Sequence, residues 1–171
     1  MAFPDIFPFL QALSTNGDET GVTNMVGNYS ATPTNFFAAP PAGTRYKVYE
    51  LKILIAANGA LNMIDYGQIG GGLTNGITIQ FNVNGVLYSG GVKVFQNWGW
   101  AGITNINVTT FAGTRQTLEA KVNFPEEYGY HLMLDGDQGD FYQLRLNDDF
   151  STLIGHQAWI RGTRVAASSQ F

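Results

Sequence analysis

Short stretches of alternating apolar and polar residues run through most of the chain, a pattern typical of strands that bury one face. Residues 77–83 read ITIQFNV, so isoleucine, phenylalanine and valine alternate with threonine, glutamine and asparagine. Asn84-Gly85 follows, and this pair favours a two-residue turn because both residues tolerate positive φ. The segment therefore predicts a β-hairpin whose second strand begins at Val86.

The longest alternating stretch covers residues 45–57 and is followed by Asn58-Gly59, a second turn signal. Alternation with a period of two places successive side chains on opposite faces of a strand. It assigns Tyr49, Leu51, Ile53 and Ile55 to one face, and Tyr46, Val48 and Leu54, together with Glu50 and Lys52, to the other.

Shorter stretches rich in β-branched and aromatic residues predict further strands. They cover residues 34–38, 61–69, 92–96, 104–111, 116–123, 131–134, 141–146 and 158–165. About eight to ten strands, spaced by roughly 8–12 residues and without amphipathic helices between them, are typical of a sandwich. We therefore predict an all-β fold, an antiparallel β-sandwich of the jelly-roll-like kind. A parallel α/β fold is excluded because it requires crossover helices.

Residues 1–33 have a different pattern. Their apolar residues are interrupted by Pro4 and Pro8 and are followed by a polar stretch over residues 14–20. We expect an extended N-terminal arm, with a short helix as one option for residues 6–13, ahead of a β-sandwich domain over residues 34–171. The arm is expected to pack either on its own domain or on a neighbouring subunit. Its candidate interface residues are Phe3, Phe7, Phe9 and Leu10.

The composition bears on partners. Charged residues make up 13% of the chain, against about 25% in an average soluble protein, while hydrophobic residues make up 44%. A surface so poor in charge favours burial against other chains, so we expect a homo-oligomer. The net charge is −4 and the 9 Lys and Arg are scattered, which argues against nucleic-acid and anionic-membrane partners. No stretch reaches the ~20 apolar residues of a membrane span.

Residues suited to catalysis are sparse. The chain has 2 histidines, His131 and His156, no cysteine, and no Gly-x-Ser-x-Gly motif to place a nucleophile. The pair Glu126-Glu127 follows a proline and is interpreted as loop charge exposed to solvent. We therefore expect neither enzyme activity nor a cofactor.

An acidic turn is a weak candidate for a calcium site. Asp135, Asp137 and Asp140 lie in the sequence DGDQGD. Carboxylates and backbone carbonyls in a glycine-rich loop can supply the oxygens that Ca²⁺ requires, although the spacing departs from that of an EF-hand. Asp and Gly are also the residues of tight strand connections. A calcium site and a plain turn both stay open at this point.

Trp98 and Trp100 flank a glycine in the sequence FQNWGW. Indole rings fill cores, anchor protein interfaces, or form a platform on which a sugar stacks. The sequence leaves all three roles open, and we take both tryptophans as candidate interface residues.

The C-terminal part of the chain carries a family resemblance. Residues 139–149, GDFYQLRLNDD, and residues 154–162, IGHQAWIRG, give an extended strand, an acidic turn and a final strand ending in glycine. This ending resembles that of phage virion-associated jelly-roll proteins. The Asn/Gly/Thr-rich, charge-poor body is similar to capsid decoration, or cement, proteins.

The resemblance implies a function for the chain. It implies a homotrimer that is made in the host cytoplasm, binds the outer capsid surface of a bacteriophage, contacts the major capsid protein and stabilises the shell. The alternative is a carbohydrate- or receptor-binding module, such as the head of a tail fibre. Trp98 and Trp100 are the residues that suggest it.

Overall fold

The computed structural model describes residues 7–101, 103–110, 115–124 and 132–166. Strands predominate, and the helices are short 3₁₀ turns. The strands are β1 (Phe7–Ala12), β2 (Thr34–Ala38), β3 (Thr44–Ala57), β4 (Ile77–Val83), β5 (Val86–Val92), β6 (Ile103–Thr110), β7 (Gln116–Asn123), β8 (Leu132–Asp135), β9 (Phe141–Leu146) and β10 (Gly155–Ala166). The 3₁₀ helices are η1 (Phe95–Ala101) and η3 (Gly136–Gln138).

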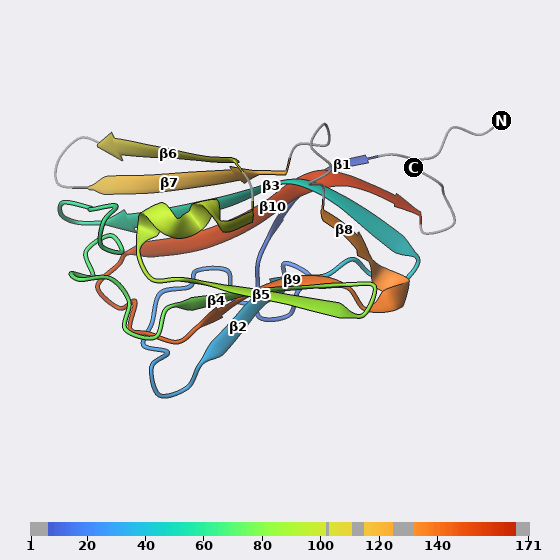
Figure 1. The fold of residues 1–171 in the computed structure, drawn as a ribbon, viewed down its shortest axis with the longest axis horizontal. Coiled ribbons are helices and arrows are strands. Elements are labelled where there is room, and N and C mark those ends of the chain that lie inside the picture. The colour runs from blue at the N-terminus through green and yellow to red at the C-terminus, as the bar shows by residue number, and fades with distance from the viewer. Residues whose placement is uncertain (1–6, 102, 111–114, 125–131, 167–171) are drawn as a thin grey trace.

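The strands form two layers that pack face to face (Figure 1). In the described part of the chain, a 6-stranded sheet has the order β1-β10-β3-β7-β6, with β8 also paired to β3. The second sheet has 4 strands in the order β2-β9-β4-β5. Each ladder is antiparallel. The predicted antiparallel β-sandwich is therefore confirmed.

The pairing is nested in the manner of a jelly roll. β1 pairs with β10, β2 with β9, β3 with β8, and β4 with β5. These ladders describe one long antiparallel hairpin, and the ladders β3–β10 and β4–β9 appear when that hairpin rolls up into two sheets. β6 and β7 form a hairpin inserted between β5 and β8, and β7 pairs with the second half of β3.

Apolar side chains from both sheets fill the space between the layers. The inner faces alternate with solvent-facing positions along each strand, as the period of two requires. Fully or almost fully buried side chains include Ile53, Ile55, Ile77, Ile79, Leu118, Ala120, Leu134, Leu144, Leu146 and Ile160. Charge is absent from this group, so the core is held by apolar packing.

The predicted faces of residues 45–57 are wrong at one end of the strand. Tyr46 and Val48 are buried on the same side as Leu51 and Ile53, whereas Tyr49 is half-buried. Arg161 lies opposite Glu50 and Gly162 lies opposite Val48, so Tyr49 is an extra residue without a partner on β10. This β-bulge shifts the alternation by one residue.

From Phe7 on, the N-terminal segment joins a sheet, so the short helix considered for residues 6–13 is wrong, while residues 1–6 lie outside the described residues. Phe7–Ala12 is strand β1, an edge strand that pairs with β10. The chain then crosses toward the second sheet, where Ser14 and Phe37 exchange backbone hydrogen bonds of 3.0 and 2.9 Å. Leu13 and Met25 are completely buried in the core. The described part of residues 1–33 therefore packs on its own domain.

Two other predicted strands differ in the structure. Residues 61–69 form turns with isolated bridges, Asn62 to Gly67 and Tyr66 to Ile69. Residues 92–96 are divided between the end of β5 and the start of η1. The Asn84-Gly85 hairpin is confirmed, with φ values of 52° and 76°. Both values are positive, as a type I′ turn requires.

A glycine-to-alanine substitution tests how tightly β3 and β10 pack. A Cβ atom added at Gly162 would lie 1.9 Å from the carbonyl oxygen of Lys47, so Gly162→Ala forces the backbone apart at the bulge. We predict a loss of about 2–3 kcal/mol in the free energy of unfolding, measured by urea denaturation. Gly155→Ala in the same strand is the control. Its Cβ would meet Ala56 Cβ at an ordinary 3.4 Å, and we expect a change within about 1 kcal/mol. Equal losses in both variants would contradict the packing argument.

Candidate functional site

The acidic turn that was a candidate for calcium lies at one end of the sandwich (Figure 1). The Asp135 carboxylate forms an ion pair of 2.7 Å with Arg45 Nε and accepts a hydrogen bond from the Asp137 amide. Burial raises the pKa of Asp135, but the bonds from Arg45 and the Asp137 amide outweigh it and hold the pKa below its usual value. The Asp137 carboxylate accepts a 2.7 Å bond from the backbone N–H of Gly43.

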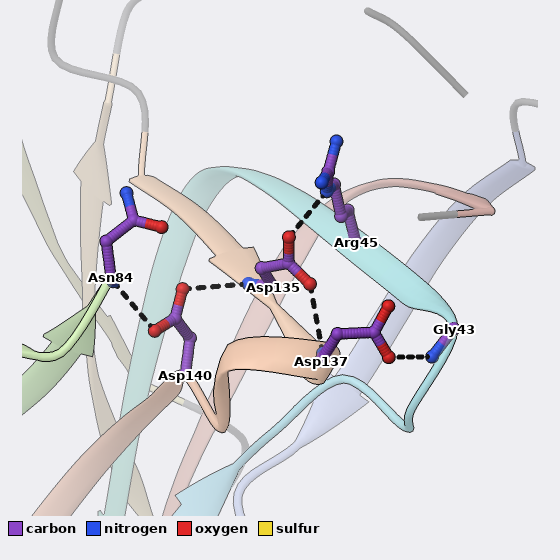
Figure 2. A network of polar contacts seen from close by, with 6 residues as sticks. All are labelled: Gly43, Arg45, Asn84, Asp135, Asp137 and Asp140. Atoms are coloured by element: carbon purple, nitrogen blue, oxygen red, sulfur yellow. Dashed lines mark hydrogen bonds and ion pairs between the residues drawn. The ribbon is translucent and has the colours of Figure 1, made fainter. Parts of the chain in front are cut away.

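Asp140 connects the β4–β5 turn to the end of β8. Its side chain is 1% exposed and accepts bonds of 2.8 Å from the Asn84 amide and 2.9 Å from the Asp135 amide (Figure 2). The carboxylates are thus directed at backbone donors and at Arg45. No group of three potential ligands that could hold a metal ion occurs among the residues described. Hydrogen bonds and one ion pair thus engage Asp135, Asp137 and Asp140, as the plain-turn interpretation expects, and a calcium site at these residues stays an untested prediction.

The tryptophan segment forms η1, and Trp98 is a core residue. Its side chain is 1% exposed, and Phe95, also in η1, is completely buried and packs edge-on against Tyr66 with ring centroids 5.7 Å apart. Of the three roles considered for Trp98, the structure supports the core, so it is neither a sugar platform nor an interface anchor. The side chain of Trp100 lies outside the described residues.

His156 is buried in the same aromatic group. Its Nε2 lies 2.9 Å from the Tyr66 hydroxyl, and its ring stacks on Phe150 with centroids 5.0 Å apart. Burial lowers the pKa of His156 to about 4, so the imidazole is neutral at neutral pH. Its position, closed to solvent, is that of a hydrogen-bonded core residue. His131 lies outside the described residues.

The predicted N-terminal interface residues differ in how far their side chains are exposed to solvent. Phe7 and Leu10 are 52% and 60% exposed on β1. Phe9 is half-buried and packs on Tyr46, with ring centroids 4.2 Å apart. Phe3 lies outside the described residues. Phe7 and Leu10 thus give β1 exposed apolar side chains, at the edge of the six-stranded sheet.

The sequence reasoning missed a second exposed apolar edge. Val86, Leu87 and Tyr88 on β5 are 52%, 56% and 48% exposed, and Tyr88 stacks on Phe81 across the hairpin at 4.9 Å. β5 ends its sheet, so alternate backbone N–H and C=O groups face away from β4. The signal was present in the sequence, because residues 77–92 contain no charged residue.

The edge strands β1 and β2 have features that hinder pairing with another strand, and β5 lacks these features. Edge strands are commonly blunted by proline, charge or a covering segment. β1 contains Pro8, and the Ala12 amide is occupied by the Glu19 carboxylate at 2.9 Å. β2 is covered in part by Ser14, which bonds to Phe37. β5 has neither proline nor charge and exposes apolar side chains, which makes it a candidate surface for binding another polypeptide.

No protein-family model matches the chain, and searches of curated proteins and of solved structures give no significant match either. The fold class therefore rests on the nested ladders, which define a jelly-roll β-sandwich. None of the helices in the described ranges has the length and hydropathy of a membrane span.

Acid should destabilise the protein through His156. The folded state binds a proton on this ring only near its pKa of about 4, whereas the ordinary value is 6.5, so the unfolded chain binds the proton first. The stabilisation is complete above about pH 6.5 and is lost as the pH falls toward 4, by about 3 kcal/mol in total. The test is urea denaturation from pH 7 to pH 4.5.

The control separates His156 from other titrating groups. His156→Gln should flatten the pH dependence between pH 6.5 and 4.5, whatever its effect on stability at pH 7. An NMR titration of the wild-type protein gives the His156 pKa directly. A value near 6.5 would overturn this account.

Proposed function

We propose that the chain is a structural protein of a bacteriophage virion, a capsid decoration protein that binds the outer capsid surface as a homo-oligomer and stabilises the shell. The observation that carries the proposal is the uncharged, unprotected edge of β5 on a jelly-roll domain. Jelly rolls are a common architecture of viral capsid domains, which adds support by analogy.

The proposed contact joins opposite sides of neighbouring copies. β5 lies on the side of the sandwich where η1 contacts β5, β6 and β7, whereas β1 lies on the side of β2. A contact of β5 with itself would have two-fold symmetry and would give a dimer. A trimer requires β5 to meet a different surface of the next copy. Phe7 and Leu10 supply exposed apolar side chains on that opposite side.

Charge favours a second copy of this chain as the occupant of β5. Like charges that lie opposite each other across a strand pair destabilise it. Residues 77–92 and residues 7–12 contain no charged residue, so the exposed apolar side chains of β5 in one copy and of β1 in the next can pack without such repulsion, while Pro8 limits backbone pairing at β1. Gly90 and Gly91 carry no side chain, which allows a neighbouring strand to approach β5 closely.

The alternative of a carbohydrate- or receptor-binding module rested on Trp98 and Trp100. Trp98 lies in the core and supplies no platform. Assembly is therefore the function that the described surface favours.

Two variants and their mixture test the assembly. We expect the wild-type protein to show the native mass of a trimer. Leu87→Lys should be monomeric because it places a charge on β5, and Leu10→Lys should be monomeric because it places one on β1. Mixing the two variants leaves one intact β5 and one intact β1 edge, so a mixed dimer should form. Val22→Lys, at a 59% exposed position outside the strands, is the control and should remain trimeric. A wild-type monomer at micromolar concentration would refute the proposal.

Attachment to a particle is a separate test. Antibodies against the purified chain should label the outer surface of intact virus particles from cultures that express its gene, as seen by immunogold electron microscopy. Particles that lack the protein should release their genome at a lower temperature, because the shell loses a stabilising layer. Finding the chain only in the particle-free fraction would exclude the decoration role.

A further inference from the structure

A groove of about 310 Å³ opens between β1 and the segment that follows β2. This volume lies at the small end of the range for ligand sites, roughly 300–1,000 Å³, and suits a single ring rather than a long chain. Phe9, Tyr46 and Arg164 line it from the six-stranded sheet, and Asn16, Asp18 and Glu19 line it from the loop after β1. It combines apolar and polar walls.

Aromatic rings form the apolar wall of the groove. Phe9 and Tyr46 pack with their centroids 4.2 Å apart and their planes tilted by 31°. Tyr46 is 6% exposed, while Phe9 is half-buried and retains accessible surface at the groove. A fixed ring that keeps an accessible surface offers an apolar contact of defined direction to a ligand.

Groups of both charges flank this wall. Arg164 and Glu19 line the groove together with Tyr46; burial raises the pKa of Tyr46, while the charge of Arg164 lowers it and that of Glu19 raises it. No ion pair or hydrogen bond of the Arg164 side chain is found among the described residues. The guanidinium therefore has donors to spare beside carboxylate acceptors.

The loop that carries the acceptors is held in place by its own hydrogen bonds. Asp18 accepts bonds of 3.0 and 2.7 Å from the amide and hydroxyl of Thr20. The buried Gln11 side chain donates to the carbonyl of Gly17. Glu19 adopts a left-handed φ of 69°, which is costly for a residue with a side chain, and bonds to the amide of Ala12. Such a strained residue is found where the surrounding structure fixes it.

We propose that this groove binds a neutral carbohydrate, with one sugar ring against Phe9 and its hydroxyls bonded to Arg164 and to the carboxylates of Asp18 and Glu19. A sugar ring has an apolar C–H face and hydroxyls that both donate and accept hydrogen bonds. It therefore matches a wall of this composition. The carboxylates of Asp18 and Glu19 would repel a strongly anionic ligand, and the guanidinium of Arg164 would repel a cationic one. A neutral ligand therefore fits this groove better than a ligand with charge of one sign.

The site is independent of the Trp98–Trp100 segment and goes beyond the assembly function. It gives the particle surface a means of contacting glycans. Leu10 lies at the rim of the groove as well as on the assembly edge, so binding is to be measured in two backgrounds. In the wild-type protein, β5 of a neighbouring copy is expected to cover β1. In the monomeric Leu87→Lys variant, no neighbouring copy covers β1, so the rim of the groove stays accessible.

The experiment screens an array of neutral and sialylated glycans, followed by NMR titration with the methyl glycosides of glucose, galactose and mannose. Neutral glycans should bind in preference to sialylated ones. Arg164→Gln should weaken the affinity about tenfold, whereas Arg161→Gln, exposed on the same strand and outside the groove, should leave it within about twofold.

A second pair of variants tests the aromatic wall. Phe9→Leu should also weaken binding about tenfold, whereas Ile64→Ala, at a 64% exposed apolar position outside the groove and outside β1 and β5, should not. If the Leu87→Lys variant binds a neutral glycan and the wild-type protein does not, the groove is still the binding site, and assembly covers it in the wild type. The proposal fails if neither background binds a neutral glycan, if sialylated glycans bind better, or if Arg164→Gln and Phe9→Leu bind as the wild type does.

Discussion

The ladder between β3 and β10 is the contact on which the rest of the molecule depends. It pairs Thr44–Ala57 with Gly155–Ala166, residues far apart in the sequence. β1 is attached to the outer side of β10, and β7 and β8 are attached in succession to the outer side of β3. The bulge at Tyr49 shifts the register by one residue next to the close approach at Gly162, and the pairing then continues along both strands.

At two places, a buried carboxylate connects separate segments of the chain by accepting hydrogen bonds from their backbone amides. Asp140 accepts amide hydrogens from Asn84 and Asp135, and Asp148 accepts those of Asn75 and Gly76 at 3.0 and 2.6 Å. A buried charge is costly unless hydrogen bonds compensate it. In a chain with 13 acidic residues, several are therefore committed to holding turns, and they are not free for chemistry.

Local signals were the ones that the sequence revealed. The Asn84-Gly85 turn follows from two residues that tolerate positive φ, and the alternation at residues 77–83 needs no distant partner. The bulge at Tyr49 arises from pairing with β10, and the burial of Trp98 and His156 arises from how distant loops close. Pro8 suggested a break, yet proline is tolerated on an edge strand, which is where the fold places it. The groove also could not be predicted, because its walls come from distant segments.

The two lateral edges of the sandwich differ in the side chains that they present. Around β5 the chain presents apolar side chains and open backbone groups, which satisfy a neighbouring strand but would bind a soluble polar ligand poorly. Around β1 the apolar side chains adjoin Asp18, Glu19 and Arg164, which can meet hydroxyl groups. In a chain with so few charges, Asp18, Glu19 and Arg164 lie beside one groove, and this uneven distribution distinguishes the proposed ligand groove from the uncharged strands of the proposed assembly contact.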